Sequence, residues 1–133
     1  MINTSATGNH TTAAVLSALL SRGHVVLLPF GDGCRYDLAY DDNGKLVRVQ
    51  CKTGRYQNGV VKFNTYSVNG GSKQHKGYTG SVDLYGVYCP LLEKTYLVPV
   101  DKVPDCSKGH LRIEPSKNNQ QSGVLWAKDF QVL

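Results

Sequence analysis

The stretch RYDLAYDDNGKLVRVQCKT, residues 35–53, decides the fold that this sequence predicts. Within it, Asn43-Gly44 separates two segments, Arg35–Tyr40 and Lys45–Lys52, whose side chains can alternate between two faces of a sheet. Asn-Gly is a strong signal for a two-residue hairpin turn, because both of its residues adopt positive φ. The stretch is therefore expected to form an antiparallel β-hairpin.

A turn at Asn43-Gly44 also fixes which residues face one another. One face is expected to be apolar, and its pairs are Tyr40 with Val47, Leu38 with Val49, and Tyr36 with Cys51. The other face is expected to be polar, and its pairs are Ala39 with Arg48, Asp37 with Gln50, and Arg35 with Lys52. Because side chains two positions apart share a face, Asp37, Gln50 and Lys52 should converge on one patch, provided that no bulge shifts the register.

The residue types of this patch suit phosphodiester chemistry. A carboxylate and an amide oxygen are hard ligands for Mg²⁺, and a bound metal can neutralise phosphate charge and lower the pKa of a water molecule. A neighbouring lysine can stabilise developing negative charge or orient that water. The solvated face of an ordinary hairpin carries the same residue types, and the pattern alone favours that simpler interpretation.

Around the hairpin, the sequence predicts one helix and several short strands. The helix is expected over Thr7–Arg22, where apolar residues recur at helical spacing. The apolar run His24–Pro29 predicts a buried strand. Further strands are expected at Val60–Phe63, Asp83–Cys89, Thr95–Val100 and Leu111–Glu114, whereas Asn69–Gly80 predicts a loop and Val124–Phe130 fits either a strand or a helical turn.

The bulk properties indicate one small globular domain. A chain of 133 residues, 41% of them hydrophobic, suits a single domain over residues 1–133. It contains neither a long apolar run nor a signal-peptide pattern, so an intracellular protein is expected. The net charge of +5 modestly favours a polyanionic partner. The widely spaced cysteines, Cys34, Cys51, Cys89 and Cys106, predict buried or half-buried free thiols and no zinc site.

The segments RYDL (Arg35–Leu38) and VQCKTGR (Val49–Arg55), in this order, resemble the signature of the PD-(D/E)XK nuclease superfamily. The Gln-X-Lys form is similar to its group I intron-encoded, homing-type branch. The resemblance covers most of the chain and extends to RGHVVLLPFGDGCRYDL, NGVVKFNT, VYCPLLEKTYLVPV, LRIEPSKNNQ and WAKDF. It implies an α/β fold with a restriction-endonuclease-like core, in which a first helix, a mixed central β-sheet and a further flanking helix surround the hairpin.

The resemblance also implies an activity and a set of site residues. The activity is metal-dependent hydrolysis of DNA phosphodiesters, with Mg²⁺ as the cofactor and Mn²⁺ as an alternative. By position, Asp37 would be the main metal ligand and Gln50 would replace the usual second acidic ligand. The backbone carbonyl of Cys51 would complete that side of the metal shell, and Lys52 would be the catalytic lysine.

One position departs from the family pattern. Members usually carry a Glu on the first helix, and here Thr12 stands in that place, in a helix without any acidic residue. Either the metal site is one carboxylate short, or the chain carries a substitution, or Asn9 or His10 compensates. The last is the least expected alternative, because both residues lie off that helical position.

Basic residues and partners complete the expectations. Phosphate or other DNA contacts are expected from Arg35, Arg48, Arg55, Lys62, Lys73, His75 and Lys76, whereas His110 is expected to be structural. Three functions are open: a homing-type endonuclease on double-stranded DNA, a structure-specific nuclease such as a Holliday-junction resolvase, and a DNA-binding module that has lost catalysis. The YDL and VQCKT details favour the first. Both nuclease functions imply a homo-oligomer, a dimer or tetramer, because two strands must be cut by two active sites.

Overall fold

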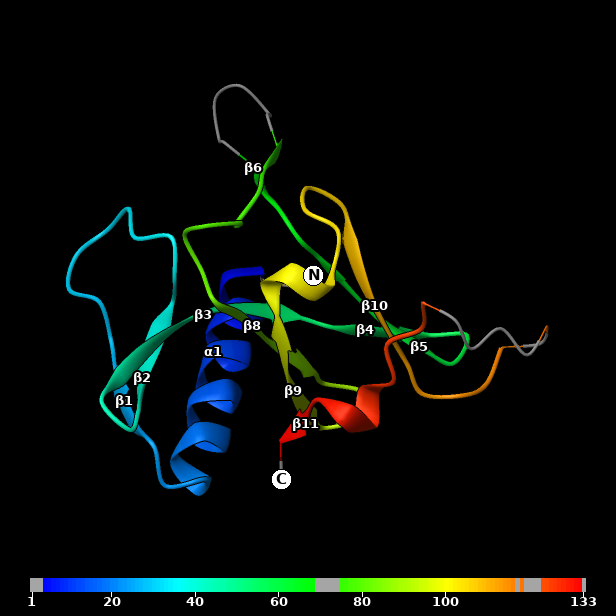
Figure 1. The fold of residues 1–133 in the computed structure, drawn as a ribbon, viewed down its shortest axis with the longest axis horizontal. Coiled ribbons are helices and arrows are strands. Elements are labelled where there is room, and N and C mark those ends of the chain that lie inside the picture. The colour runs from blue at the N-terminus through cyan, green and yellow to red at the C-terminus, as the bar shows by residue number, and fades with distance from the viewer. Residues whose placement is uncertain (1–3, 69–74, 117, 119–122, 133) are drawn as a thin grey trace.

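The computed structural model describes residues 4–68, 75–116, 118 and 123–132. Within them, one α-helix, α1 (Thr4–Ser21), lies against a six-stranded sheet of order β1-β2-β3-β8-β9-β11 (Figure 1). The strands are β1 (Val25–Leu27), β2 (Leu38–Asp42), β3 (Lys45–Thr53), β8 (Leu84–Cys89), β9 (Lys94–Pro99) and β11 (Gln131–Val132). The sheet is mixed, because β3 and β8 run parallel while the other neighbours are antiparallel.

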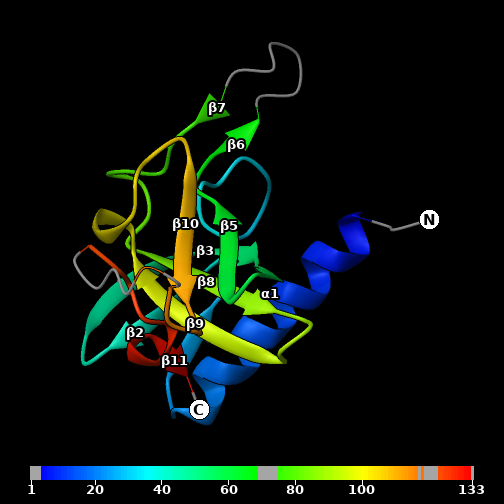
Figure 2. The ribbon, with the colours of Figure 1, turned by 90° about the vertical axis from the view of Figure 1, so that its right-hand side faces the viewer.

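A second sheet lies on the side of the central sheet away from α1 (Figure 2). It has three strands in the order β10 (Lys108–Arg112), β5 (Val60–Asn64) and β4 (Arg55–Gln57). The two short strands β6 (Ser67–Val68) and β7 (His75–Lys76) pair antiparallel. The 3₁₀ turn η1 (Val100–Lys102) follows β9, and a second one, η2 (Ala127–Asp129), precedes β11.

Two apolar clusters hold these layers together, one on each face of the central sheet. Between α1 and the sheet the buried residues are Val15, Leu19, Leu38, Tyr40, Val49 and Cys51. Between the two sheets, Val61, Phe63 and Leu111 pack with residues of β8 and β9 that include Tyr85 and Tyr96. Gly86 of β8 lets α1 approach closely, since a Cβ there would lie 2.7 Å from Cγ1 of Val15.

The fold class and the hairpin register agree with the expectations. The ladder from Leu38–Val49 to Asp42–Lys45 has the predicted pairs, and Asn43 and Gly44 have φ of 54° and 92°. The expected further flanking helix is absent from the described residues, where the three-stranded sheet covers that face instead. No helix in these residues is long and apolar enough to span a membrane.

Other sequence expectations need correction. The apolar run His24–Pro29 does not form a buried strand, because β1 lies at the edge of the sheet and Val25 is 66% exposed. The strand β4 was not predicted, although Asn58-Gly59 forms the same kind of positive-φ turn, with φ of 53° and 78°. Two of the four free thiols, Cys34 and Cys106, are exposed and not buried.

Candidate active site

Asp37 lies just beyond the regular ladder between β2 and β3, whose last pair is Leu38 with Val49. The backbone N–H of Asp37 donates to the Val49 carbonyl at 2.9 Å, so two residues of one strand oppose Val49. This is the geometry of a β-bulge, which offsets the alternation of side chains. Tyr36 accordingly packs against the cluster between the sheets, whereas Leu38 faces α1. The expected pairs of Asp37 with Gln50, Tyr36 with Cys51, and Arg35 with Lys52 are therefore absent from the ladder.

The bulge places the Asp37 carboxylate against an open edge of β3. Since β2 ends at Leu38, the backbone of β3 beyond Val49 has no strand partner on that side, and the Cys51 N–H donates to Oδ2 of Asp37 at 2.9 Å. The N–H and C=O of one strand residue point to the same edge, so the Cys51 carbonyl lies on the edge that the carboxylate occupies. The sequence-predicted ligands Asp37 and Cys51 are thus neighbours, through a bulge and not through regular pairing.

A pocket of about 370 Å³ brings α1 to this edge. Its lining residues are Ser5, Gly8, Asn9, Thr11, Thr12, Asp37, Gln50, Cys51 and Thr53. The three predicted ligands therefore share one pocket. Thr12 lines it too, and its hydroxyl acts to lower the pKa of the neighbouring Cys51 thiol, against the larger effect of burial. Thr12, which stands where the nuclease family that this sequence resembles usually carries a Glu, thus lies beside the predicted metal ligands.

The helix supplies residues that the sequence interpretation missed. Asn9 lines the pocket, which corrects the expectation that it lies off the position of Thr12. Residues three apart on a helix share a face, so this placement could have been inferred from the spacing alone. Thr11 also lines the pocket, and its hydroxyl is hydrogen-bonded to that of Thr53 at 2.6 Å. His10 points elsewhere, with its ring 5.7 Å from the ring of Tyr88.

Lys52 is close to the pocket but does not line it. Its Nζ donates to the Tyr66 carbonyl at 2.9 Å and to the Tyr78 hydroxyl at 3.0 Å, and it lies 4.6 Å from the centre of the Tyr78 ring. These contacts lie on the face of β3 opposite α1, because Lys52 alternates with the α1-facing Cys51. Its positive charge nevertheless reaches Asp37, whose pKa it lowers.

The electrostatics of the pocket favour a cation at Asp37. Burial raises the pKa of the Asp37 carboxyl above its ordinary value, while the hydrogen bond from Cys51 and the charge of Lys52 act in the opposite direction. A cation beside the carboxylate would offset the desolvation of the charged form. The carboxylate therefore lies where a positive ligand would be stabilised.

The donor set suits a hard metal ion. Asp37 offers a carboxylate, Gln50 an amide oxygen and Cys51 a carbonyl oxygen, which are ligand types of Mg²⁺ and Mn²⁺. Burial and the charge of Asp37 raise the pKa of the Cys51 thiol to about 12, so this thiol is protonated at neutral pH in the metal-free protein. Asp37 is the one acidic residue among those that line the pocket.

The predicted DNA contacts fall into separate groups. Arg48 forms an ion pair with Asp83 at 3.1 Å, and the hydrogen bond from Arg48 lowers the pKa of that carboxyl. Arg35 donates to the Ser67 hydroxyl at 2.8 Å and to the Gly77 carbonyl, so both guanidinium groups have partners inside the protein. Lys73 lies outside the described residues, and the backbones of His75 and Lys76 form β7. Arg55 and Lys62 line a different hollow.

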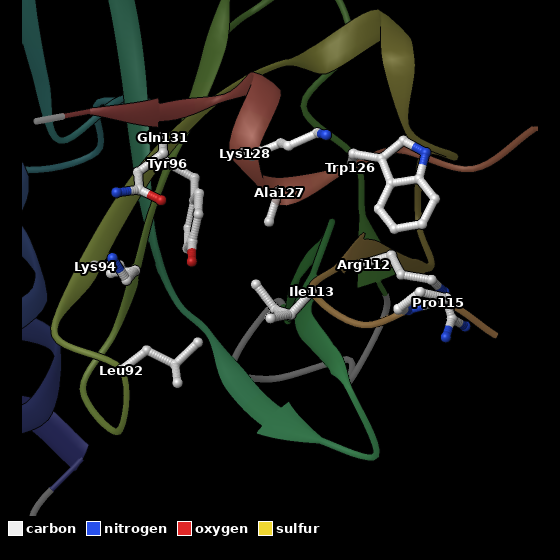
Figure 3. A pocket seen from close by; sticks show the side chains of 10 residues that line it. All are labelled: Leu92, Lys94, Tyr96, Arg112, Ile113, Pro115, Trp126, Ala127, Lys128 and Gln131. Carbon is white, nitrogen blue, oxygen red and sulfur yellow. The ribbon is translucent and has the colours of Figure 1, made fainter. Parts of the chain in front are cut away.

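A separate cavity of about 480 Å³ is mostly apolar (Figure 3). It is lined by Leu92, Lys94, Tyr96, Arg112, Ile113, Pro115, Trp126, Ala127, Lys128 and Gln131. The Tyr96 side chain points into this space, where its buried hydroxyl has no hydrogen-bond partner among the described residues. None of the sequence-predicted site residues lines this cavity, so it is distinct from the pocket at Asp37.

A helix packed on a mixed sheet, with a carboxylate at a bulge and a lysine on the adjacent strand, defines a nuclease-like α/β protein. The sequence matches the family of the PD-(D/E)XK endonuclease over residues 2–133, so the chain belongs to this family. The fold is similar to that of a bacterial homing endonuclease, I-Ssp6803I, with a TM-score of 0.70 and 24% identity over 98% of this chain and 88% of that one. No curated protein matches the sequence.

Proposed function

We propose that this nuclease is a metal-dependent endonuclease that hydrolyses phosphodiester bonds in double-stranded DNA, in the manner of a homing enzyme. The observation that carries the proposal is the pocket in which Asp37, Gln50 and Cys51 meet Thr12 of α1. Membership of the endonuclease family supports the reaction class, and the similar fold of a homing endonuclease supports the type of substrate.

The residues of the pocket have distinct roles in this proposal. The Asp37 carboxylate, the Gln50 amide oxygen and the Cys51 carbonyl would hold Mg²⁺, which supplies Lewis-acid stabilisation of the phosphate and activation of water when bound. Lys52, oriented by Tyr66 and Tyr78, stabilises negative charge that develops on the phosphate oxygens. The Cys51 N–H orients Asp37 toward the edge of β3.

A comparison of DNA substrates tests the proposal. The protein is incubated with Mg²⁺ or Mn²⁺ and a linear duplex library, a four-way junction or single-stranded DNA, with EDTA as the control. Metal-dependent cutting of linear duplex is expected. Cutting confined to the four-way junction would replace the homing function by that of a resolvase, and cutting in EDTA would contradict the metal site.

The pocket itself favours one alternative function, that of a DNA-binding module. With Thr12 in the helix, Asp37 is the single carboxylate that lines the pocket, and one carboxylate holds Mg²⁺ weakly. A protein that binds duplex DNA but cuts none of the substrates at any metal concentration would support this alternative. For the enzyme, we propose a dimer or tetramer, which light scattering of the purified protein tests.

Thr12→Glu is expected to tighten metal binding on the order of tenfold or more. A second carboxylate near the metal adds an attraction of roughly 4 kcal/mol per pair of unit charges at about 4 Å and an effective dielectric constant near 20, part of which is lost to desolvation. Isothermal titration with Mn²⁺ measures the change. Ala13→Glu is the matched control, because Ala13 is exposed and does not line the pocket. Equal affinities of the two variants would show that position 12 does not reach the metal.

A further inference from the structure

The three-stranded sheet presents a row of basic side chains on its outer surface. Arg55 of β4 pairs with Lys62 of β5, and Lys62 pairs with His110 of β10, so three basic residues lie side by side across the strands. Lys108 follows on the same face of β10, two residues before His110. We call Arg55, Lys62, Lys108 and His110 the basic face. The alternate residues of these strands, such as Val61 and Leu111, are buried in the core.

Among the described residues, no acidic side chain forms an ion pair with the basic face. The strands β4, β5 and β10 contain no Asp or Glu, and none of the four residues forms an ion pair within the part of the chain that the structure describes. Like charges directly opposite one another in a sheet are destabilising. Partial burial is the main cause that holds the pKa of His110 below its ordinary value, and repulsion from the charges of Lys62, Lys108 and Arg112 lowers it further.

The basic face is continuous with the candidate active site. Arg55, Lys62 and Lys108 line a hollow of about 290 Å³ together with Thr53, Phe63 and Asn64. Thr53 also lines the pocket that contains Asp37, so the two concave regions adjoin at the end of β3. The chain passes directly from β3 to β4 through Gly54, where a Cβ would lie only 2.7 Å from Cγ1 of Val61. Because only Gly54 separates β3 from β4, Arg55 lies next to the pocket at the end of β3.

We propose that the basic face binds the phosphodiester backbone of the DNA segment that leaves the candidate active site. The proposal rests on the function proposed above and extends it to a defined surface. A phosphate chain supplies the negative charges that the three strands lack, and Lys and Arg side chains that bind phosphates hold DNA without reading its sequence. His110, expected from the sequence to be structural, is exposed on this surface and joins the contact.

The test compares two double variants that each lose two positive charges. Lys62→Gln/Lys108→Gln removes charge from the basic face. Lys45→Gln/Lys94→Gln is the matched control, because these two lysines are exposed and lie outside the hollow. The affinity of each protein for a duplex is measured by fluorescence anisotropy in EDTA over a series of salt concentrations. The slope of log affinity against log salt should decrease by about 2 in the first variant, since each phosphate contact contributes about 0.9, and should stay unchanged in the control.

Two further measurements separate binding from folding and from chemistry. The melting temperature of Lys62→Gln/Lys108→Gln should equal or exceed that of the parent, because the substitution relieves repulsion. The single-turnover cleavage rate of the control Lys45→Gln/Lys94→Gln should match that of the parent, because neither lysine lies in the hollow. If the salt slope of Lys62→Gln/Lys108→Gln equals that of the parent, or if its weaker binding comes with a lower melting temperature, the basic face is not the DNA-binding surface. Either result would leave the proposed function intact. A parent that binds no duplex DNA would overturn both proposals.

Discussion

Asp37→Asn is expected to reduce single-turnover DNA cleavage by about a thousandfold or more. Asp37 is the main metal ligand of the site proposed above and the one acidic residue among those that line the parent's pocket, and a catalytic metal contributes several kcal/mol to transition-state stabilisation. Each 1.4 kcal/mol or so corresponds to a factor of ten in rate. Asn can still accept the hydrogen bond from the Cys51 N–H through its amide oxygen, so the bulge should persist. The rate is measured in the Thr12→Glu background, which supplies the second carboxylate.

The same substitution should not lower stability at neutral pH. Burial raises the pKa of Asp37 in the folded protein, so the carboxyl favours folding in its protonated form and this contribution is lost as pH rises through the folded-state pKa. At pH 7 the metal-free parent therefore carries the cost of a desolvated charge, which Asp37→Asn removes. Thermal unfolding in EDTA should show an equal or higher melting temperature for the variant, and a smaller loss of stability than the parent between acidic and neutral pH.

The exposed Asp42, at the end of β2, gives a matched control. Asp42→Asn makes the same chemical change on the hairpin and should retain both cleavage and Mn²⁺ binding. If Asp37→Asn instead cuts DNA at a rate close to that of its parent, the metal site does not lie at the bulge.

Lys52→Met is expected to slow cleavage by about a hundredfold or more while duplex affinity stays close to that of the parent. Removing one group that stabilises transition-state charge typically costs this much in rate, and the loss falls on the chemical step and not on ground-state binding. Met keeps an unbranched chain beside the Tyr78 ring but removes the ammonium that donates to Tyr66 and Tyr78. Single-turnover rates and anisotropy affinities on the same duplex provide the comparison.

The structure shows that Lys52 also has a structural role, which its position on a polar hairpin face did not suggest. Each lost hydrogen bond typically lowers stability by about 1 kcal/mol, so a modest drop in melting temperature is expected with Lys52→Met. Tyr78→Phe removes one of the same hydrogen bonds but keeps the ammonium, and it separates the two effects. If Tyr78→Phe and Lys52→Met slow cleavage equally, Lys52 acts by holding Tyr66 and Tyr78 in place and not by stabilising charge.

Local sequence was sufficient for the hairpin and for the choice of residues around the site. The Asn43-Gly44 turn fixes the register of its own strands, because a two-residue loop permits one pairing, and the ladder from Leu38 to Asp42 follows it. Asn58-Gly59 is the same kind of two-residue turn, so the pairing of β4 with β5 is also encoded locally. The helical spacing of Asn9 and Thr12 was likewise sufficient to place both on one side of α1.

Tertiary structure decided how those residues meet. The alternation along β2 holds only as far as Leu38, since the bulge at Asp37 puts Tyr36 on the face opposite that of Leu38. The alternation along β3 puts Lys52 on the face opposite α1, but only the tertiary structure brings Tyr66 and Tyr78, which are distant in sequence, to its ammonium. The second sheet depends on the pairing of β10 with β5, a long-range contact that no local pattern encodes. The sequence by itself therefore determined the residue types, the turn and the family, whereas long-range pairing and the bulge determined which side chains share the pocket.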